Sequence, residues 1–206
     1  MSAEISRIYL LDAATGGAVE AELRDAIEAE NLNDWQTKWQ PALLGVLQGL
    51  ARKGVPQAQW PQSWHWNWQE KTARVSGLLA YKGFSIVALG ETQGLAQIDL
   101  TKSARILGEA GKPIVYIDYL EAAPWNRPEL GGSARLRGVG TALITAAVFL
   151  SLEEGFKGRI GLHSLPQADT FYRDRCGMTD LGPDPDCQNL RYFEFTPGQA
   201  GTFLEE

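Results

Sequence analysis

The sequence predicts a mixed α/β domain, with helices covering the faces of one sheet. Two observations predict this class. Residues 114–163 form a strand, helix, strand pattern, which is typical of a βαβ unit with two parallel strands and a right-handed crossover. Residues 84–100 form two apolar runs around a Gly-containing turn, as in an antiparallel hairpin. The sheet is therefore expected to contain both strand directions.

The overall composition limits the class of protein. A chain of 206 residues with 44% hydrophobic and 21% charged residues is enough for one globular domain. The formal net charge of −6 disfavours nucleic acid as the main partner. Apolar runs are too short for a bilayer span, the start lacks the pattern of a signal peptide, and two cysteines make a disulfide framework unexpected. We therefore expect a cytoplasmic protein with no membrane partner.

The front of the chain is expected to be mainly helical. Ile5–Leu11 is a branched apolar run before a turn and is predicted as a strand. Residues 19–27 place Val, Leu, Ala and Ile at helical spacing, and residues 33–52 continue with a second helical pattern. Residues 54–63 are rich in Pro, Gln and Gly and are expected to form a connector.

The rest of the chain supplies the expected sheet. Residues 114–120 are a dense Ile/Val/Tyr run, typical of a central strand that is buried on both faces. Further elements are expected after it: a helix over 139–152, a strand over 159–163, a short helix over 167–175 and a late strand over 190–195.

The segment from Arg135 to Leu143 carries the clearest chemical signal. Gly138 and Gly140 stand where a loop opens the predicted helix over 139–152. Glycines let the backbone approach a ligand closely, and the unpaired amides of a helix start attract an anion such as a pyrophosphate. A plain turn and helix cap would show the same glycines. The pattern differs from the dinucleotide-binding fingerprint, which has a third glycine, and from a P-loop, which continues with Gly-Lys-Ser/Thr.

Two motifs in this region resemble the GNAT superfamily of N-acetyltransferases. Arg135-Leu-Arg-Gly-Val-Gly140 is similar to the family's pyrophosphate motif, Arg-x-x-Gly-x-Gly. Ala168-Asp-Thr-Phe-Tyr-Arg-Asp-Arg-Cys-Gly-Met178 is similar to its Ala-x-x-Phe-Tyr signature. The resemblance covers about residues 75–196. It implies a GNAT-like, mostly antiparallel central sheet flanked by helices, with a βαβ unit that binds acetyl-CoA.

The resemblance also implies roles for single residues. The backbone of Ala122 matches the position that polarises the thioester carbonyl, and Tyr172 matches the acid that protonates the departing thiolate. Ser164 stands near a position that is often Asn in the family and is a candidate polar contact to the cofactor. The pyrophosphate would be held by backbone amides of the motif, with Arg135 at its first position: Leu136, Arg137, Gly138, Val139, Gly140 and Thr141.

The base that takes the amine proton is less clearly marked. Asp118 and Glu121 lie on the predicted central strand and are the two candidates, with Glu91 in the hairpin turn as another. His163 ends the strand after the helix and is a further candidate proton relay. Each of these residues has an ordinary alternative as a solvated, salt-bridged or hydrogen-bonded side chain.

Cysteine and metal chemistry are not expected. Cys176 stands at the end of a predicted helix and is interpreted as a structural thiol, so direct transfer is favoured over an acetyl-cysteine route. The two histidines and two cysteines have no metal-ligand spacing, so no metal is predicted.

All seven tryptophans precede residue 126, and four of them fall within residues 60–68. Packing of the front helices accounts for most of them. An acceptor pocket lined by aromatic faces is the alternative, and Trp125 is the candidate for substrate binding because it lies in a loop.

Together these observations predict one GNAT-like domain over residues 1–206. It would have a helical, tryptophan-rich front (1–74), a sheet core (75–196) and a tail (197–206). The predicted function is acetyl transfer from acetyl-CoA to a primary amine of a small molecule or protein. The alternatives are a CoA-binding sensor without turnover and a toxin-like acetylator of aminoacyl-tRNA. The resemblance is also compatible with a homodimer.

Overall fold

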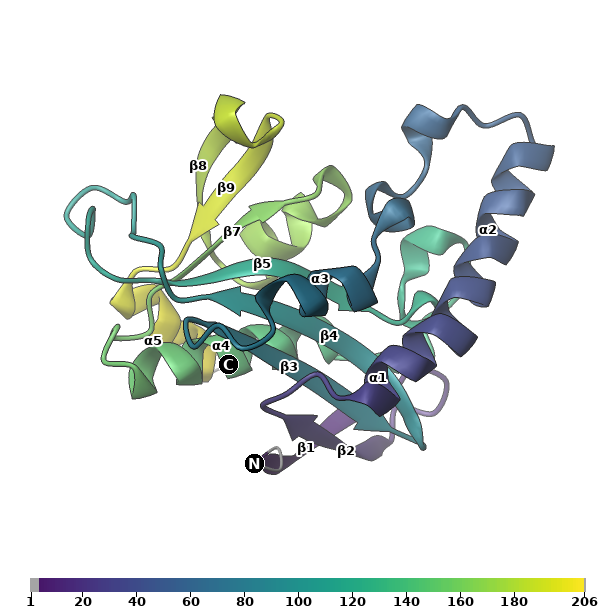
Figure 1. Cartoon of the computed structure of the whole chain (residues 1–206), viewed down its shortest axis with the longest axis horizontal. Helices are drawn as coiled ribbons and strands as arrows, with labels where there is room; N and C mark the ends of the chain where they lie inside the picture. Colours follow the sequence, from purple (N-terminus) through teal and green to yellow (C-terminus); the bar gives the residue numbers. More distant parts are fainter. Residues whose placement is uncertain (1–3, 206) are drawn as a thin grey trace. The chain divides into compact units, whose positions relative to one another are not determined.

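The computed structural model describes residues 4–205, which form one nine-stranded sheet with helices (Figure 1). The strand order is β6-β1-β2-β3-β4-β5-β7-β9-β8. The strands are β1 (Ile5–Asp12), β2 (Ala18–Arg24), β3 (Tyr81–Ala88), β4 (Glu91–Asp99), β5 (Val115–Ala122), β6 (Leu136–Arg137), β7 (Ile160–Ser164), β8 (Thr179–Asp184) and β9 (Leu190–Glu194). The α-helices are α1 (Ala29–Asp34), α2 (Gln40–Arg52), α3 (Trp68–Val75), α4 (Val139–Glu153) and α5 (Pro197–Glu205).

The chain divides into two compact units, and β3, β4 and β5 each contribute residues to both. The first unit comprises residues 4–78, 83–95 and 121–140, which hold the N-terminal strands and helices. The second comprises residues 79–82, 96–120 and 141–205, which hold most of α4 and the last three strands.

The N-terminal hairpin of the first unit corrects one prediction. Residues 18–24 form strand β2, which pairs antiparallel with β1, rather than the expected helix. In this stretch Val19, Ala21 and Leu23 alternate with Glu20 and Glu22, and an alternation of period two is the pattern of a half-buried strand. The turn over residues 12–17 brings β2 back along β1. Pairing with β1 therefore decides that residues 18–24 form a strand rather than a helix.

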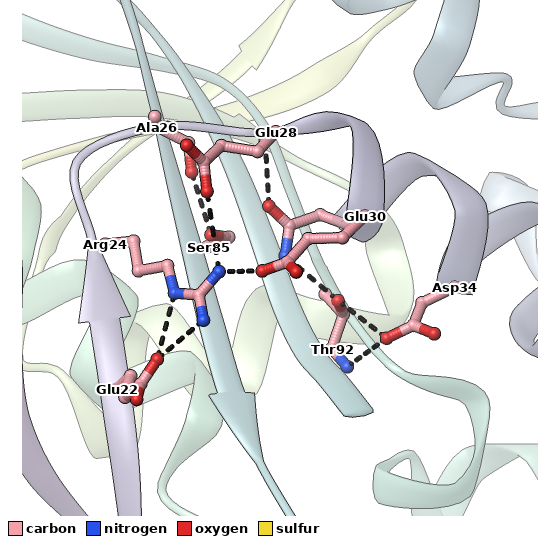
Figure 2. Close-up of polar contacts among 9 residues, drawn as sticks. Glu22, Arg24, Ala26, Glu28, Glu30, Asp34, Ser85 and Thr92 are labelled. Atoms are coloured by element: carbon pink, nitrogen blue, oxygen red, sulfur yellow. Dashed lines mark hydrogen bonds and ion pairs between the residues drawn. The ribbon is translucent and has the colours of Figure 1, made fainter. Parts of the chain in front are cut away.

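The predicted helix over 33–52 is confirmed and starts earlier than expected. It runs as α1, a π-helical turn over Trp35–Trp39, and α2. Polar side chains join α1 to the strands of its unit, as Figure 2 shows. The Asn31 amide donates to Thr92 Oγ1 at 3.1 Å, and Asp34 accepts from the backbone and the hydroxyl of Thr92 at 2.8 and 3.1 Å. Arg24 pairs with Glu22, Glu28 and Glu30 at the other side of this network.

The second unit contains the predicted βαβ pattern. β5 and β7 are parallel, with Val115 opposite Ile160, and α4 is the helix that connects them along the chain. Ile160 and Leu162 are buried on β7, and Leu143, Ile144 and Val148 are buried on α4. This accounts for the apolar character of α4 around most of its circumference.

The end of the chain differs from the prediction. β8 pairs antiparallel with β9, and no strand was expected at residues 179–184. That stretch contains Gly182 and Pro183, which signal turns rather than strands. Residues 197–205, expected as a tail, form helix α5, in which Ala200 and Phe203 are buried. Among residues 4–205 no helix has the length and apolar character that a bilayer span requires.

Asn31 provides a test of how α1 is held. It is fully buried, its amide nitrogen donates to Thr92, and its Oδ1 accepts from the Glu28 backbone at 2.8 Å. Asn31→Ala leaves these partners unpaired, and we expect it to lower the free energy of unfolding by about 2 kcal/mol in urea titrations. Asn33→Ala, at an exposed position of the same helix, should change it by less than about 0.5 kcal/mol. Equal effects of the two substitutions would contradict this account.

Candidate functional site

The glycine motif forms the junction between β6 and α4. Gly138 has a φ of 95°, in the left-handed region that favours glycine, and α4 begins at the next residue. A Cβ at Gly138 would meet only Leu10 Cδ2, at 3.7 Å, so conformation rather than space requires glycine there. The amides of the first helical turn have no acceptor within the helix, so residues 138–141 present donors and the positive end of the helix dipole. Arg135 and Arg137 are exposed beside them.

One predicted donor of this motif is already paired. The amide of Leu136 donates to Asn126 Oδ1 at 2.9 Å, and Leu136 lies opposite Asp12 in the pairing of β6 with β1. The amide of Arg135 likewise donates to the carbonyl of Trp125. The candidate amides for an anion are therefore those from Gly138 to Thr141, and the pairing of β6 positions them.

Gln93 on β4 organises the loop that follows β5. Its Oε1 accepts from Trp125 Nε1 at 2.9 Å and from Asn126 Nδ2 at 2.8 Å. Its backbone carbonyl accepts from the amide of Ala123 at 2.9 Å. The predicted role of Ala122 as a donor to a ligand remains a prediction.

Glu121 is buried at the end of β5 in a polar network. Its Oε2 accepts from Trp68 Nε1 at 2.7 Å, and its Oε1 accepts from Arg127 Nη1 at 3.1 Å. Arg127 is also buried and donates to Ser63 and to Glu129. Burial raises the pKa of Glu121, and the Arg127 guanidinium opposes that rise. The Glu121 carboxylate therefore takes up a proton more readily than a carboxylate exposed to water.

Tryptophans of the front segment line a pocket next to this carboxylate. Trp35, Trp39 and Trp66 form its walls together with Glu121 and Pro124. The free space holds about one water-sized group. Trp125, the tryptophan predicted to bind substrate, packs edge to face on Trp39, with ring centroids 6.5 Å apart, and lies under the Arg135 guanidinium. The sequence predicts that most of these tryptophans pack the front helices, and their spacing along the chain does not show which rings converge.

In the second unit, Tyr172 lies in a π-helical turn over Phe171–Arg175 and is buried among aromatic rings. Its ring centroid is 5.2 Å from that of Phe171 and 5.9 Å from that of Phe193. Burial raises the pKa of its hydroxyl well above the usual value of 10.0. Tyr172 is therefore protonated at neutral pH, as a proton donor must be.

His163 belongs to a hydrogen-bonded chain that sequence analysis missed. Its Nδ1 lies 2.6 Å from Tyr116 Oη, and its Nε2 lies 2.9 Å from Asp184 Oδ2. Arg105 Nη1 also donates to Asp184 Oδ2, at 2.5 Å, and this contact holds the pKa of Asp184 below its usual range. The pKa of His163 is lowered mainly by burial. Strands β5, β7 and β8 and the loop that holds Arg105 supply these residues, and no local pattern in the sequence links them.

The second unit also holds Asp118 and Ser164. Asp118 is partly buried on β5. The pKa of Tyr81 is raised mainly by the charge of Asp99 and that of Tyr116 mainly by burial, and the charge of Asp118 adds to both. Ser164 is buried, and its hydroxyl donates to the carbonyl of Leu165 at 2.9 Å. The role of Asp118 as a base and that of Ser164 as a contact to the cofactor remain predictions.

Solved structures with the same architecture include acetyltransferases. A GNAT-family acetyltransferase from Listeria monocytogenes aligns with 92% of this chain and 99% of its own, at a TM-score of 0.53 and 16% identity. PaiA N-acetyltransferase from Thermoplasma acidophilum, solved with coenzyme A, aligns with 84% of this chain and 97% of its own, at a TM-score of 0.51 and 13% identity. FeeM, an N-acyl amino acid synthase from uncultured soil microbes, aligns with 88% of this chain and 93% of its own, at a TM-score of 0.55 and 13% identity.

The chain has the GNAT fold. At these identities the likeness concerns the fold. No protein-family model matches the sequence, and no curated protein does so either. The GNAT-like fold that was predicted from the two motifs is confirmed, including the mostly antiparallel sheet with its βαβ unit.

Two cysteines occur in this GNAT fold, and neither forms a disulfide. Cys176 is buried, and burial raises the pKa of its thiol to about 12, which disfavours the thiolate needed for a covalent route. Cys187 is partly exposed and lies with His163 and Asp184 in a group whose ligand atoms are within 4.8 Å of one another. In that group Asp184 already accepts from the cationic Arg105.

The two thiols should differ in reactivity. At pH 8 we expect a disulfide reagent such as Ellman's reagent to modify Cys187 in the native protein and Cys176 only on unfolding, because Cys176 is buried with a raised pKa. The measurement is the number of thiols titrated with and without denaturant. The Cys187→Ser variant should show no native reaction, and rapid native labelling of that variant would reveal a reactive Cys176.

Proposed function

We propose that the chain is an N-acetyltransferase of the GNAT superfamily, which transfers the acetyl group of acetyl-CoA to a primary amine by direct attack. The observation that carries the proposal is the position of Gly138. Its left-handed φ stands directly before the start of α4, within the Arg-x-x-Gly-x-Gly pattern of a GNAT fold. This combination supports binding of a pyrophosphate, since first-turn amides and the helix dipole both favour an anion.

The residues around the motif suit coenzyme A. The amides of residues 138–141 are the proposed donors to the pyrophosphate, and the exposed Arg135 and Arg137 supply positive charge beside them. The amide of Ala122, which precedes the bonded amide of Ala123, is the proposed donor to the acetyl thioester. A donor at that oxygen stabilises the negative charge that develops when the carbonyl carbon is attacked.

The proposed transfer needs two proton movements. The neutral amine nitrogen attacks the carbonyl carbon, the carbon–sulfur bond breaks, and the departing thiolate takes a proton. Tyr172 is the proposed donor of that proton, and its raised pKa keeps the proton available at neutral pH. The amine loses a proton to a base. Glu121 is the proposed base because it is buried with a raised pKa, and Asp118 is the second candidate.

One observation favours a second function. Both oxygens of Glu121 already have partners, as expected of a structural carboxylate. If Glu121 is structural and no other residue acts as base, the chain would be a CoA-binding sensor or interaction module without turnover. The two functions differ in whether bound acetyl-CoA is consumed.

The cofactor proposal is tested by calorimetric titration with acetyl-CoA and CoA. We expect micromolar binding to the wild type and none to Gly138→Glu, because a carboxylate there would repel the pyrophosphate. Gly131→Glu is the matched control, since Gly131 has the same φ of 95° but lies in open space before the motif. Retained binding in Gly138→Glu, or equal loss in both variants, would contradict the proposed phosphate site.

The proposed acid is tested by Tyr172→Phe. We expect acetyl transfer, followed as release of free CoA thiol, to fall by about 10²-fold or more while CoA affinity stays unchanged. Tyr9→Phe, at an exposed tyrosine of β1, should retain full activity. A Tyr172→Phe variant with normal turnover would exclude this residue as the acid, and wild-type binding without any turnover would favour the sensor.

A further inference from the structure

The tryptophan pocket of the first unit has the chemistry of a cation site. Its walls are the indole rings of Trp35, Trp39 and Trp66, and the carboxylate of Glu121 forms part of the same lining. The faces of indole rings attract cations, and the attraction is stronger where water is excluded. Trp35, Trp39 and Glu121 are buried, so the pocket combines aromatic faces with a desolvated negative group.

An ammonium group of the protein already lies against these rings. Lys71 Nζ is 4.8 Å from the centroid of Trp66. Lys71 and Arg127 are the cations that lower the pKa of Glu121 through their charge, and Glu129 shares Arg127 with it. The charges of the two acidic and two basic side chains in this cluster therefore cancel. The cluster has no net positive charge that would repel a further cation.

The hydrogen bonds of Glu121 leave room for one more donor. A carboxylate offers about four acceptor positions. Trp68 and Arg127 occupy one position on each oxygen, and Ser63 provides a third contact. Among the contacts described for residues 4–205, these three leave one of the four positions, and Glu121 lines the pocket.

The size of the pocket selects among cations. Its free space accepts about one water-sized group, which is the size of the –NH₃⁺ head of a primary amine. A trimethylammonium head is several times larger and would need the tryptophan walls to move apart. Within residues 4–205 the pocket lining contains no Arg or Lys to receive an acidic head, and the Lys71 ammonium lies on Trp66 without being part of that lining.

We propose that this pocket holds the protonated head of an unbranched primary alkylamine, and that this amine is the acetyl acceptor. The proposal rests on the proposed acetyl transfer. The ammonium donates to Glu121 and contacts the indole faces. Transfer of one proton from the ammonium to the carboxylate leaves a neutral amine and a neutral Glu121. The amine lone pair then attacks the thioester carbon and the carbon–sulfur bond breaks. The second proton lost by the nitrogen balances the one that the departing thiolate takes up, so the products are the amide and the CoA thiol. Trp35, Trp39 and Trp66 set the specificity.

The first test uses the unmodified protein and three small probes. Tryptophan fluorescence is followed during titration with n-butylamine, n-butanol and tetramethylammonium, at constant pH and ionic strength. We expect saturable binding of n-butylamine, with both other probes at least about tenfold weaker, because one lacks the charge and the other is too large. Equal responses to all three probes, or no saturable response to n-butylamine, would overturn the proposal.

Paired variants locate the site. Glu121→Gln should weaken n-butylamine binding by about tenfold or more, whereas Glu129→Gln, which removes the other partner of Arg127, should not. Since Glu121→Gln disturbs a buried ion pair, Trp66→Leu provides a second test, with Trp60→Leu as its control outside the pocket lining. Unchanged amine binding in Trp66→Leu would overturn the proposal.

Titration of the same variants with CoA separates the two proposals. Loss of amine binding with intact CoA affinity supports the acceptor pocket. If the wild type binds CoA but not n-butylamine, the acceptor-pocket proposal is wrong and the acetyltransferase proposal is unaffected. A wild type that binds no CoA would contradict the acetyltransferase proposal itself.

Discussion

The buried pair of Glu121 and Arg127 is the constraint on which the first unit depends most. Neither charge is accessible to water, and a buried charge is tolerated only where its partners satisfy it. Those partners come from three separate places in the chain: Trp68 at the start of α3, Ser63 in the connector and Glu129 after β5. The connector over residues 54–67 has little regular structure of its own. The hydrogen bond from Arg127 to Ser63 holds it to the buried ion pair at the end of β5.

This arrangement explains why polar and aromatic residues occur together in the front segment. Indole rings supply large apolar surfaces and one N–H donor each. Trp39 donates to Thr92 and Trp68 donates to Glu121, so each ring is positioned by one hydrogen bond while its faces pack or remain available. Trp39 is the pocket-lining ring that is fixed in this way, and a fixed wall favours selection by size.

The glycine motif depends on a second set of buried amide contacts. Gln93 binds Trp125 and Asn126, and Asn126 in turn accepts from the amide of Leu136. The motif is thereby held by a side chain of β4 that lies more than forty residues earlier in the chain. The proposed phosphate loop thus relies on a long-range network, and Gln93 is as much a part of its geometry as Gly138.

The sequence by itself determined the βαβ unit, the GNAT motifs and the type of fold, because hydrophobic period and glycine position are local properties. It misjudged β2, where Val19 and Leu23 fit both a helical spacing and an alternating one, and only pairing with β1 separates the two. It named Glu121 and Trp125 but could not show that Glu121 is paired with Arg127 or that Trp35 and Trp66 line one pocket. These contacts join residues far apart in the chain, and such contacts are decided by packing rather than by any local pattern.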